Sequence, residues 1–185
     1  MGALGDERLL ALLESDGPAL ASGDPAVFVS GAMAELVERC AVANIGVVTA
    51  DEREQGGRIS LNLGHSLAHA IETVAGFRGI LHGEAVAYGL RAALRIGVAV
   101  GVTPPERAER VELLLDRLEL GCVALPHPVG AVLDAVATDK KHHGGRLRWV
   151  LATAGGWTVR ADIPPDLVAE AARSTLAGSP AGASA

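Results

Sequence analysis

Hydrophobic positions recur every three or four residues along most of this 185-residue chain, which predicts a mainly helical protein. We expect Leu36, Val37, Cys40 and Val42 to be buried in the second helix. Turn-forming residues at 17–25 and 51–57 separate the first three helices. The expected helices cover residues 6–14, 26–50, 58–76, 82–101, 104–120, 129–137 and 165–176.

The pattern changes near the carboxyl end. Residues 146–152 and 157–163 alternate or contain β-branched residues on either side of Gly155 and Gly156, which is typical of a two-stranded hairpin. The last residues, 177–185, are small and predict a disordered tail. The sequence therefore predicts one domain over residues 1–176, a helical bundle with a small C-terminal β-hairpin.

A row of polar residues interrupts the apolar pattern of the third expected helix. Arg58, Asn62, His65, His69 and Glu72 are spaced 4, 3, 4 and 3 apart, which predicts that they share one face of a single helix. We expect this face to line a polar cavity that acts on an anion or a metal. A solvated helix face is the alternative interpretation of Arg58 and Glu72.

A further histidine, His82, begins the next expected helix. Together with His65 and His69 it could hold a divalent metal, since imidazole suits zinc, cobalt and iron. Histidine pairs four apart are also common without metal, so spacing alone leaves both interpretations open. Gly64 and Gly83 each adjoin a histidine and would leave room for a ligand near the backbone.

Composition narrows the class of protein. The chain is 49% hydrophobic and 3% aromatic and carries a net charge of -6, which argues against a nucleic-acid partner. Cys40 and Cys122 are far apart in the sequence, and we interpret them as reduced core cysteines rather than as a disulfide. With no secretory signal and no apolar stretch long enough to span a bilayer, we expect a cytoplasmic protein without a membrane partner.

Three sequence blocks together resemble the C-terminal domain of the 3-dehydroquinate synthase family. The blocks are ADEREQGGRISLNLGHSLAHAIE, LHGEAVAYGL and DKKHHGG, and the likeness extends from about residue 5 to residue 165. Taken alone, the third block, which includes Asp139, Lys140 and Lys141, would be interpreted as a charged loop. The resemblance implies the reaction of that family in the shikimate pathway of aromatic amino acid biosynthesis. In it, a carbon-oxygen lyase converts 3-deoxy-arabino-heptulosonate 7-phosphate to 3-dehydroquinate and phosphate.

The resemblance also implies roles for individual residues. His65 and His82 match ligands of zinc or cobalt, and His69 matches an active-site histidine that is placed to relay protons. Arg58 and Asn62 match contacts to the phosphorylated keto-acid substrate, as does one of Lys140 and Lys141. The family's transient oxidation by NAD uses an N-terminal nucleotide-binding domain.

This chain departs from the family in three respects. The sequence has no match to the NAD domain, and it is expected to begin just after a segment that supplies a glutamate metal ligand and a substrate-binding lysine. Asn44 stands where a further substrate-binding lysine is usual. We therefore expect a partner chain that carries the NAD domain, no NAD binding or cyclisation by this polypeptide alone, and a homo-oligomer formed through an uncovered apolar face.

Other functions are compatible with the same residues. A sugar-phosphate cyclase paralogue of secondary metabolism would explain Asn44 through a changed substrate. A non-catalytic interaction domain could have kept the fold and lost the chemistry. Metal-dependent alcohol dehydrogenases such as glycerol dehydrogenase place histidines on a similar helical domain but lack the three blocks together.

Overall fold

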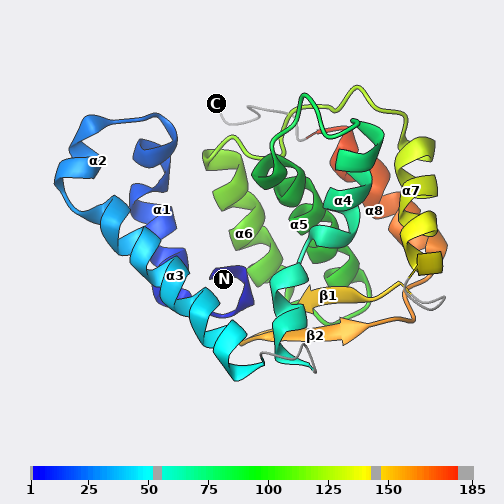
Figure 1. The fold of residues 1–185 in the computed structure, drawn as a ribbon, viewed down its shortest axis with the longest axis horizontal. Coiled ribbons are helices and arrows are strands. Elements are labelled where there is room, and N and C mark those ends of the chain that lie inside the picture. The colour runs from blue at the N-terminus through cyan, green and yellow to red at the C-terminus, as the bar shows by residue number, and fades with distance from the viewer. Residues whose placement is uncertain (1, 52–55, 143–146, 179–185) are drawn as a thin grey trace.

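The computed structural model describes residues 2–51, 56–142 and 147–178, and it is mainly helical with a small antiparallel hairpin, as the sequence predicts (Figure 1). The predicted disordered tail covers residues 177–185. Ala177 and Gly178 are ordered at the end of the last helix, where their amides donate to the carbonyl oxygens of Arg173 and Thr175. Residues 179–185 lie outside the described residues, so their disorder stays a prediction. The elements in chain order are η1 (Gly2–Leu4), α1 (Glu7–Ala21), α2 (Pro25–Val29), α3 (Ala32–Ala50), η2 (Gly57–Asn62), α4 (His65–Val74), α5 (His82–Ala99), α6 (Pro105–Arg117), α7 (Val129–His142), β1 (Trp149–Ala152), β2 (Trp157–Arg160) and α8 (Pro165–Leu176).

The helix α5 is the centre of the core. It packs against α4, α6, α8 and β1, and its Leu94 and Ile96 are fully buried. Leu67 and Ile71 of α4 and Leu151 of β1 are also fully buried in the same cluster. Burying apolar side chains of this size stabilises a fold by roughly 1.5–3 kcal/mol each, so the contacts of α5 anchor the elements around it.

The hairpin covers one end of the helical body. Trp149 pairs with Arg160 and Ala152 with Trp157 in an antiparallel register. Strand β1 is buried along its whole length, whereas β2 is more exposed. The hydroxyl of Thr103, after α5, donates to the carbonyl oxygen of Ala152 at 2.6 Å and ties the hairpin to the body.

The helices α1, α2 and α3 form an arm beside the body, on the left in Figure 1. The predicted loop at 17–25 is wrong for its first half, because α1 continues through Pro18 to Ala21. Gly17 lies close against the side chain of Leu118, and a Cβ there would come within 2.9 Å of it. This tertiary contact favours continuation of the helix past residues that usually end one.

The predicted single helix over 26–50 is also wrong. Gly31 has a positive φ of 82°, which separates α2 from α3. No residue of α3 is buried, and Val37 and Val42 are 59% and 62% exposed, so the predicted burial of Leu36, Val37, Cys40 and Val42 is incorrect. The reason is that α3 packs mainly on α1, α2 and η2, and its other face has no covering element in the described part of the chain.

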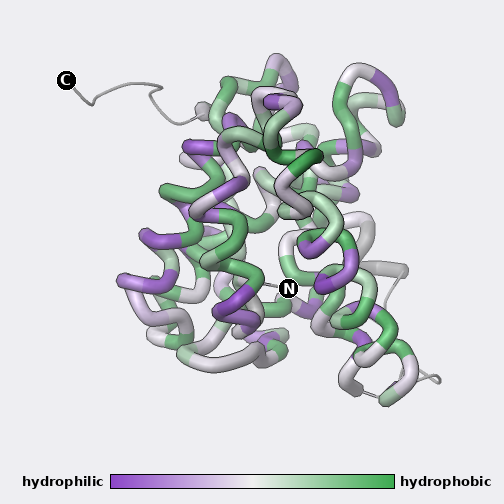
Figure 2. The backbone as a smooth tube through the Cα atoms, turned by 90° about the vertical axis from the view of Figure 1, so that its left-hand side faces the viewer, coloured by the Kyte–Doolittle hydropathy of each residue, from purple (hydrophilic) through white to green (hydrophobic). Residues whose placement is uncertain are grey.

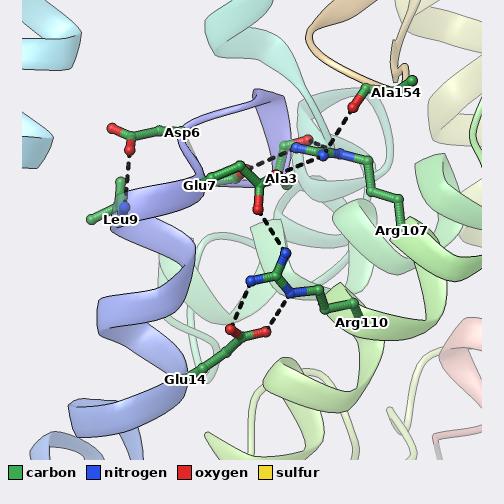
Figure 3. Close-up of polar contacts among 9 residues, drawn as sticks. Ala3, Asp6, Glu7, Leu9, Glu14, Arg107, Arg110 and Ala154 are labelled. Atoms are coloured by element: carbon green, nitrogen blue, oxygen red, sulfur yellow. Dashed lines mark hydrogen bonds and ion pairs between the residues drawn. The ribbon is translucent and has the colours of Figure 1, made fainter.

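Two arginines of α6 hold the arm to the body (Figure 3). The guanidinium of Arg107 donates to the carbonyl oxygens of Gly2, Ala3 and Ala154, and it also pairs with Glu7 at 3.0 Å. Arg110 donates to both oxygens of Glu14, at 2.6 and 2.8 Å, and to Glu7 at 2.6 Å. These contacts fix α1 on α6 with charge-assisted hydrogen bonds.

Helix α7 is longer than the sequence suggests. It runs to His142, so the backbone of Lys140 and Lys141 is helical and the interpretation as a loop is incorrect for residues 139–142 of this block. The rest of the block lies outside the described residues. Among the described residues, no helix combines the length and the apolar character needed to cross a membrane. The hydropathy of the backbone positions, seen from the side of the arm, is shown in Figure 2.

Candidate functional site

The polar row that begins at Arg58 does not lie on a single helix. Arg58 and Asn62 belong to the 3-10 helix η2, and α4 begins only at His65. Leu63 is extended, with ψ 121°, and Gly64 has φ 82°, so the chain turns between the two helices. The prediction of one shared face is therefore wrong, and its physical cause is the close approach of Gly64 to the backbone of α5.

The remaining members of the row do share a face of α4. His65, His69 and Glu72 follow one another at spacings of four and three residues within this helix. The opposite side of α4 carries Leu67 and Ile71, which are fully buried against the core. Burial of this apolar side sets the rotation of the helix and directs the polar face away from the core.

The structure brings three imidazole rings together at the junction of α4 and α5. The ring centroids of His65 and His69 are 5.5 Å apart, and those of His65 and His82 are 5.3 Å apart. The rings of His69 and His82 are stacked, with centroids 6.3 Å apart and an angle of 26° between their planes. His82, the first residue of α5, thus joins two residues of α4 in one cluster, as the sequence predicts for their convergence.

Two of these rings are oriented by contacts at Nδ1. Nδ1 of His65 lies 3.2 Å from the carbonyl oxygen of Leu63. Nδ1 of His82 lies 2.9 Å from Oε1 of Glu72. Glu72 is thus engaged with an imidazole and only 12% exposed, so the alternative of a solvated helix face is incorrect for Glu72. For Arg58 this alternative stays a prediction.

The half-buried position of His65 affects its protonation. Burial is the main cause that lowers the pKa of His65 below its ordinary value of 6.5, and the nearby rings of His69 and His82 lower it further. The hydrogen bond with Leu63 opposes this change. The result favours the neutral imidazole at pH 7, which is the form that ligates metals and accepts protons.

The described residues fit a divalent metal only in part. In the ranges that the structure describes, no group of three or more His, Cys, Asp or Glu side chains is arranged to hold a metal ion. His65 and His82 each engage Nδ1 with an acceptor and leave Nε2 for an ion, which is the usual arrangement of metal-bound histidine. Glu72 contacts His82, and Glu84 accepts a hydrogen bond from the amide of Leu81 at 2.8 Å. A catalytic zinc takes three protein ligands, so a further ligand is required.

The expected substrate contacts are less completely defined. The backbone amide of Arg58 donates to Oδ2 of Asp51 at 3.0 Å, and Asn62 is exposed at the end of η2. The side chains of Lys140 and Lys141 lie outside the described part of the chain, so their role stays a prediction. Their helix, α7, packs against α4, which carries two of the three histidines.

The glycines beside the histidines have different surroundings. Gly64 does not leave room for a ligand, because a Cβ there would meet the backbone of Leu90 at 2.8 Å. Gly83 has no heavy atom within 4 Å of a Cβ position, so the space expected there is present. The partner of Gly64, Gly89 of α5, was missed by sequence analysis because only the packing of α4 on α5 reveals it.

Comparison with known proteins agrees with the arrangement of the described elements. The family model described as 3-dehydroquinate synthase C-terminal matches residues 1–142. The 3-dehydroquinate synthase of Jannaschia sp. (strain CCS1) is 37% identical over 184 residues, which cover 96% of this chain and 48% of that protein. That of Ruegeria sp. (strain TM1040) is 38% identical over 184 residues, with 95% and 48% covered. The chain thus spans about half the length of the curated relatives it matches.

Two solved structures share the fold. A 2-epi-5-epi-valiolone synthase from Streptomyces hygroscopicus subsp. jinggangensis 5008, with NAD+ and Zn2+ bound, is 25% identical with a TM-score of 0.78 and covers 94% of this chain and 47% of its own. A 2-deoxy-scyllo-inosose synthase is 22% identical with a TM-score of 0.60, with 75% and 40% covered, and shows the fold alone. Since the family model matches residues 1–142 and relatives of over 30% identity span nearly all of this sequence, the chain belongs to the 3-dehydroquinate synthase family, whose C-terminal domain it matches.

Proposed function

We propose that this chain supplies the metal- and substrate-binding half of a 3-dehydroquinate synthase. The reaction would convert 3-deoxy-arabino-heptulosonate 7-phosphate to 3-dehydroquinate and phosphate. The observation that carries the proposal is the meeting of His65, His69 and His82, from two helices, with ring centroids between 5.3 and 6.3 Å apart. In the proposal, His65 and His82 hold zinc or cobalt, which polarises substrate oxygens when bound.

The other residues of the site act on the substrate in this proposal. His69 is exposed, with its ring beside those of both proposed ligands, and in the proposal it accepts or returns a proton as a general acid–base catalyst. Arg58 and one of Lys140 and Lys141 supply positive charge to the carboxylate and phosphate of the keto-acid phosphate. Asn62 donates or accepts hydrogen bonds with the hydroxyl groups of the same substrate.

The proposal includes a second polypeptide half that carries the NAD site and the third metal ligand. Two observations support it. The relatives are about twice as long as the chain, and α3 exposes apolar side chains that include Val37, Val42 and Ile45, at 59%, 62% and 63% exposure. Apolar surface of this kind is typical of a covered interface. We propose that the occupant of this face is the half of the protein that the relatives carry in addition.

A chimeric protein tests the function. This chain replaces the matching half of the Ruegeria relative, and the chimera is mixed with NAD+, zinc and the heptulosonate phosphate. Phosphate release that falls by at least a hundredfold in the His65→Ala and His82→Ala variants supports the proposal. A folded chimera that binds zinc and releases no phosphate contradicts it. The chain alone is expected to release none, and release at an enzyme-like rate would refute the need for a second half.

A second candidate is a sugar-phosphate cyclase with a different substrate. It is favoured by Asn44, which is exposed on α3 where the family usually has a substrate-binding lysine, and by the TM-score of 0.78 to the valiolone synthase. The Asn44→Lys variant of the same chimera discriminates the two candidates. If the chain belongs to a 3-dehydroquinate synthase, the chimera with Asn44 already turns over the heptulosonate phosphate. If it belongs to a cyclase with a different substrate, the chimera with Asn44 turns over another sugar phosphate, and only the Asn44→Lys variant turns over the heptulosonate phosphate.

A further inference from the structure

The carboxylate of Glu72 makes a direct contact with one proposed metal ligand. Its Oε1 lies 2.9 Å from Nδ1 of His82, although the two residues belong to different helices. The side chain of Glu72 is only 12% exposed, whereas that of His82 is 56% exposed. The buried partner is thus the fixed one, and it restrains a ring that is otherwise open to solvent.

This contact determines which nitrogen of His82 carries the proton. An ionised carboxylate only accepts hydrogen bonds, so Nδ1 of His82 must be the donor. In the neutral ring, Nε2 then has the free lone pair. His65 has the same tautomer through a different partner. Its Nδ1 faces the carbonyl oxygen of Leu63, which also only accepts hydrogen bonds. In both neutral rings, Nε2 is therefore the nitrogen with a free lone pair.

Other groups around His82 do not provide the same restraint. The ring of His69 is stacked with that of His82, with centroids 6.3 Å apart and an angle of 26° between the planes, and such an arrangement of rings does not fix a proton. Glu84, in the first turn of the same helix, accepts the amide hydrogen of Leu81 with its Oε2. Within the described residues, the acidic side chain that forms a hydrogen bond with this imidazole is that of Glu72.

We propose that Glu72 is a positioning residue, which holds His82 in the tautomer protonated at Nδ1 so that Nε2 is available to a divalent metal. The inference rests on the proposed function, in which His82 is a ligand. A metal-bound histidine usually donates its second N–H to a carboxylate or carbonyl, and loss of that partner costs about 10–100-fold in metal affinity. Glu72 has this position relative to His82.

Tautomers can be measured without any metal. In the full chain labelled with 15N at histidine, long-range proton–nitrogen correlations at a pH well above the usual histidine pKa identify the protonated nitrogen of each ring. We expect Nδ1–H at His82 in the wild type and a shift toward Nε2–H, the form that free imidazole side chains favour, in Glu72→Ala. His65 should keep its tautomer, because its partner is a backbone carbonyl.

Zinc affinity gives the second readout. Competition with a chromophoric chelator should show affinity about 10–100-fold lower in Glu72→Ala, with a smaller loss in the isosteric Glu72→Gln, whose amide oxygen still accepts. Glu84→Gln is the matched control, because it removes the same charge two residues from His82 on the same helix, at a side chain whose hydrogen bond is to the amide of Leu81. It should leave both the tautomer of His82 and the affinity for zinc unchanged.

The outcomes separate this inference from the proposed function. If His82 keeps Nδ1–H in Glu72→Ala, or if Glu84→Gln lowers zinc affinity as much as Glu72→Gln does, the positioning role is refuted. If the tautomer of His82 depends on Glu72 but a wild-type chimera with the second half binds no zinc, the metal-dependent function fails and the effect of Glu72 on the ring stands.

Discussion

The carbonyl of Gly64 lies directly against the backbone of Gly89. A Cβ added to Gly89 would overlap that carbonyl oxygen and also come within 3.2 Å of the amide nitrogen of Ala68. Gly64 ends the turn before α4, and Gly89 lies in the middle of α5. The missing side chain therefore lets α4 approach α5 closely enough for His65 and His82 to meet.

Substitution of Gly89 by alanine should separate the two helices. Because the overlapping atoms are backbone, α4 must move, and we expect the free energy of unfolding to fall by about 3 kcal/mol. Denaturant titration measures this loss, and zinc affinity of the folded fraction should fall with it. Gly130→Ala is the control, because Gly130 of α7 has no heavy atom within 4 Å of its Cβ position. Equal stability of the Gly89→Ala and Gly130→Ala proteins would refute this account.

The starts of several helices follow from local sequence. Pro105 and Pro165 occupy the first helical position of α6 and α8, as expected of a residue that has no amide hydrogen to leave unpaired. His82 likewise begins α5 at the predicted residue. These boundaries depend on a few neighbouring residues, so the sequence alone was sufficient to predict them.

The interruptions of helices do not follow in the same way. Spacings of four and three residues from Arg58 to Glu72 fit one continuous helix, and the turn at Gly64 depends on contact with Gly89, twenty-five residues away in the chain. The contact of Glu72 with His82 likewise depends on the packing of α4 against α5 and is not visible in local sequence. Convergence of the histidines was predictable from spacing and family resemblance, whereas the groups that orient them required the tertiary structure.

The exposed apolar side chains of α3 should cause the isolated chain to associate. Val42 and Ile45 are 62% and 63% exposed, and removing such surface from water is favourable by roughly 25 cal/mol for each Å². The double variant Val42→Glu and Ile45→Glu should therefore shift the chain toward monomer in sedimentation equilibrium. Leu113→Glu, at a 58% exposed position on α6, should leave association unchanged. A strictly monomeric wild-type chain would contradict the prediction.

Asp116 compensates a buried positive charge. The guanidinium of Arg91 is 1% exposed and donates to Oδ1 of Asp116 at 2.7 Å and to the carbonyl oxygen of Leu120 at 2.9 Å. Its Nε and Nη1 have no partner among the described residues. Asp116→Asn should lower the free energy of unfolding by about 2 kcal/mol, less than for a fully buried pair because Asp116 is half-exposed.

The surface pair of Arg160 and Asp162 provides the comparison for Asp116. Both of its members are exposed, and its two hydrogen bonds are each 2.6 Å long. Asp162→Asn should change stability much less than Asp116→Asn, because water already solvates both charges. A similar loss in the two variants, measured by denaturant titration, would show that burial of Arg91 has no particular energetic consequence.

Acid should weaken the attachment of the arm through Glu14. Hydrogen bonds from Arg110 are the main cause that lowers the pKa of Glu14 below its ordinary value of 4.5, and partial burial opposes this change without cancelling it. A carboxyl group with a lowered pKa in the folded state stabilises the fold above its unfolded pKa, and this contribution is lost as the pH falls through the folded value. Glu14→Gln should therefore cost about 1 kcal/mol at neutral pH. The difference between variant and wild type should disappear progressively below pH 4.5. Glu109→Gln is the control, because Glu109 forms no ion pair in the described part of the chain, and it should leave the free energy of unfolding at neutral pH unchanged. A pH-independent effect of Glu14→Gln would exclude the charge as its cause.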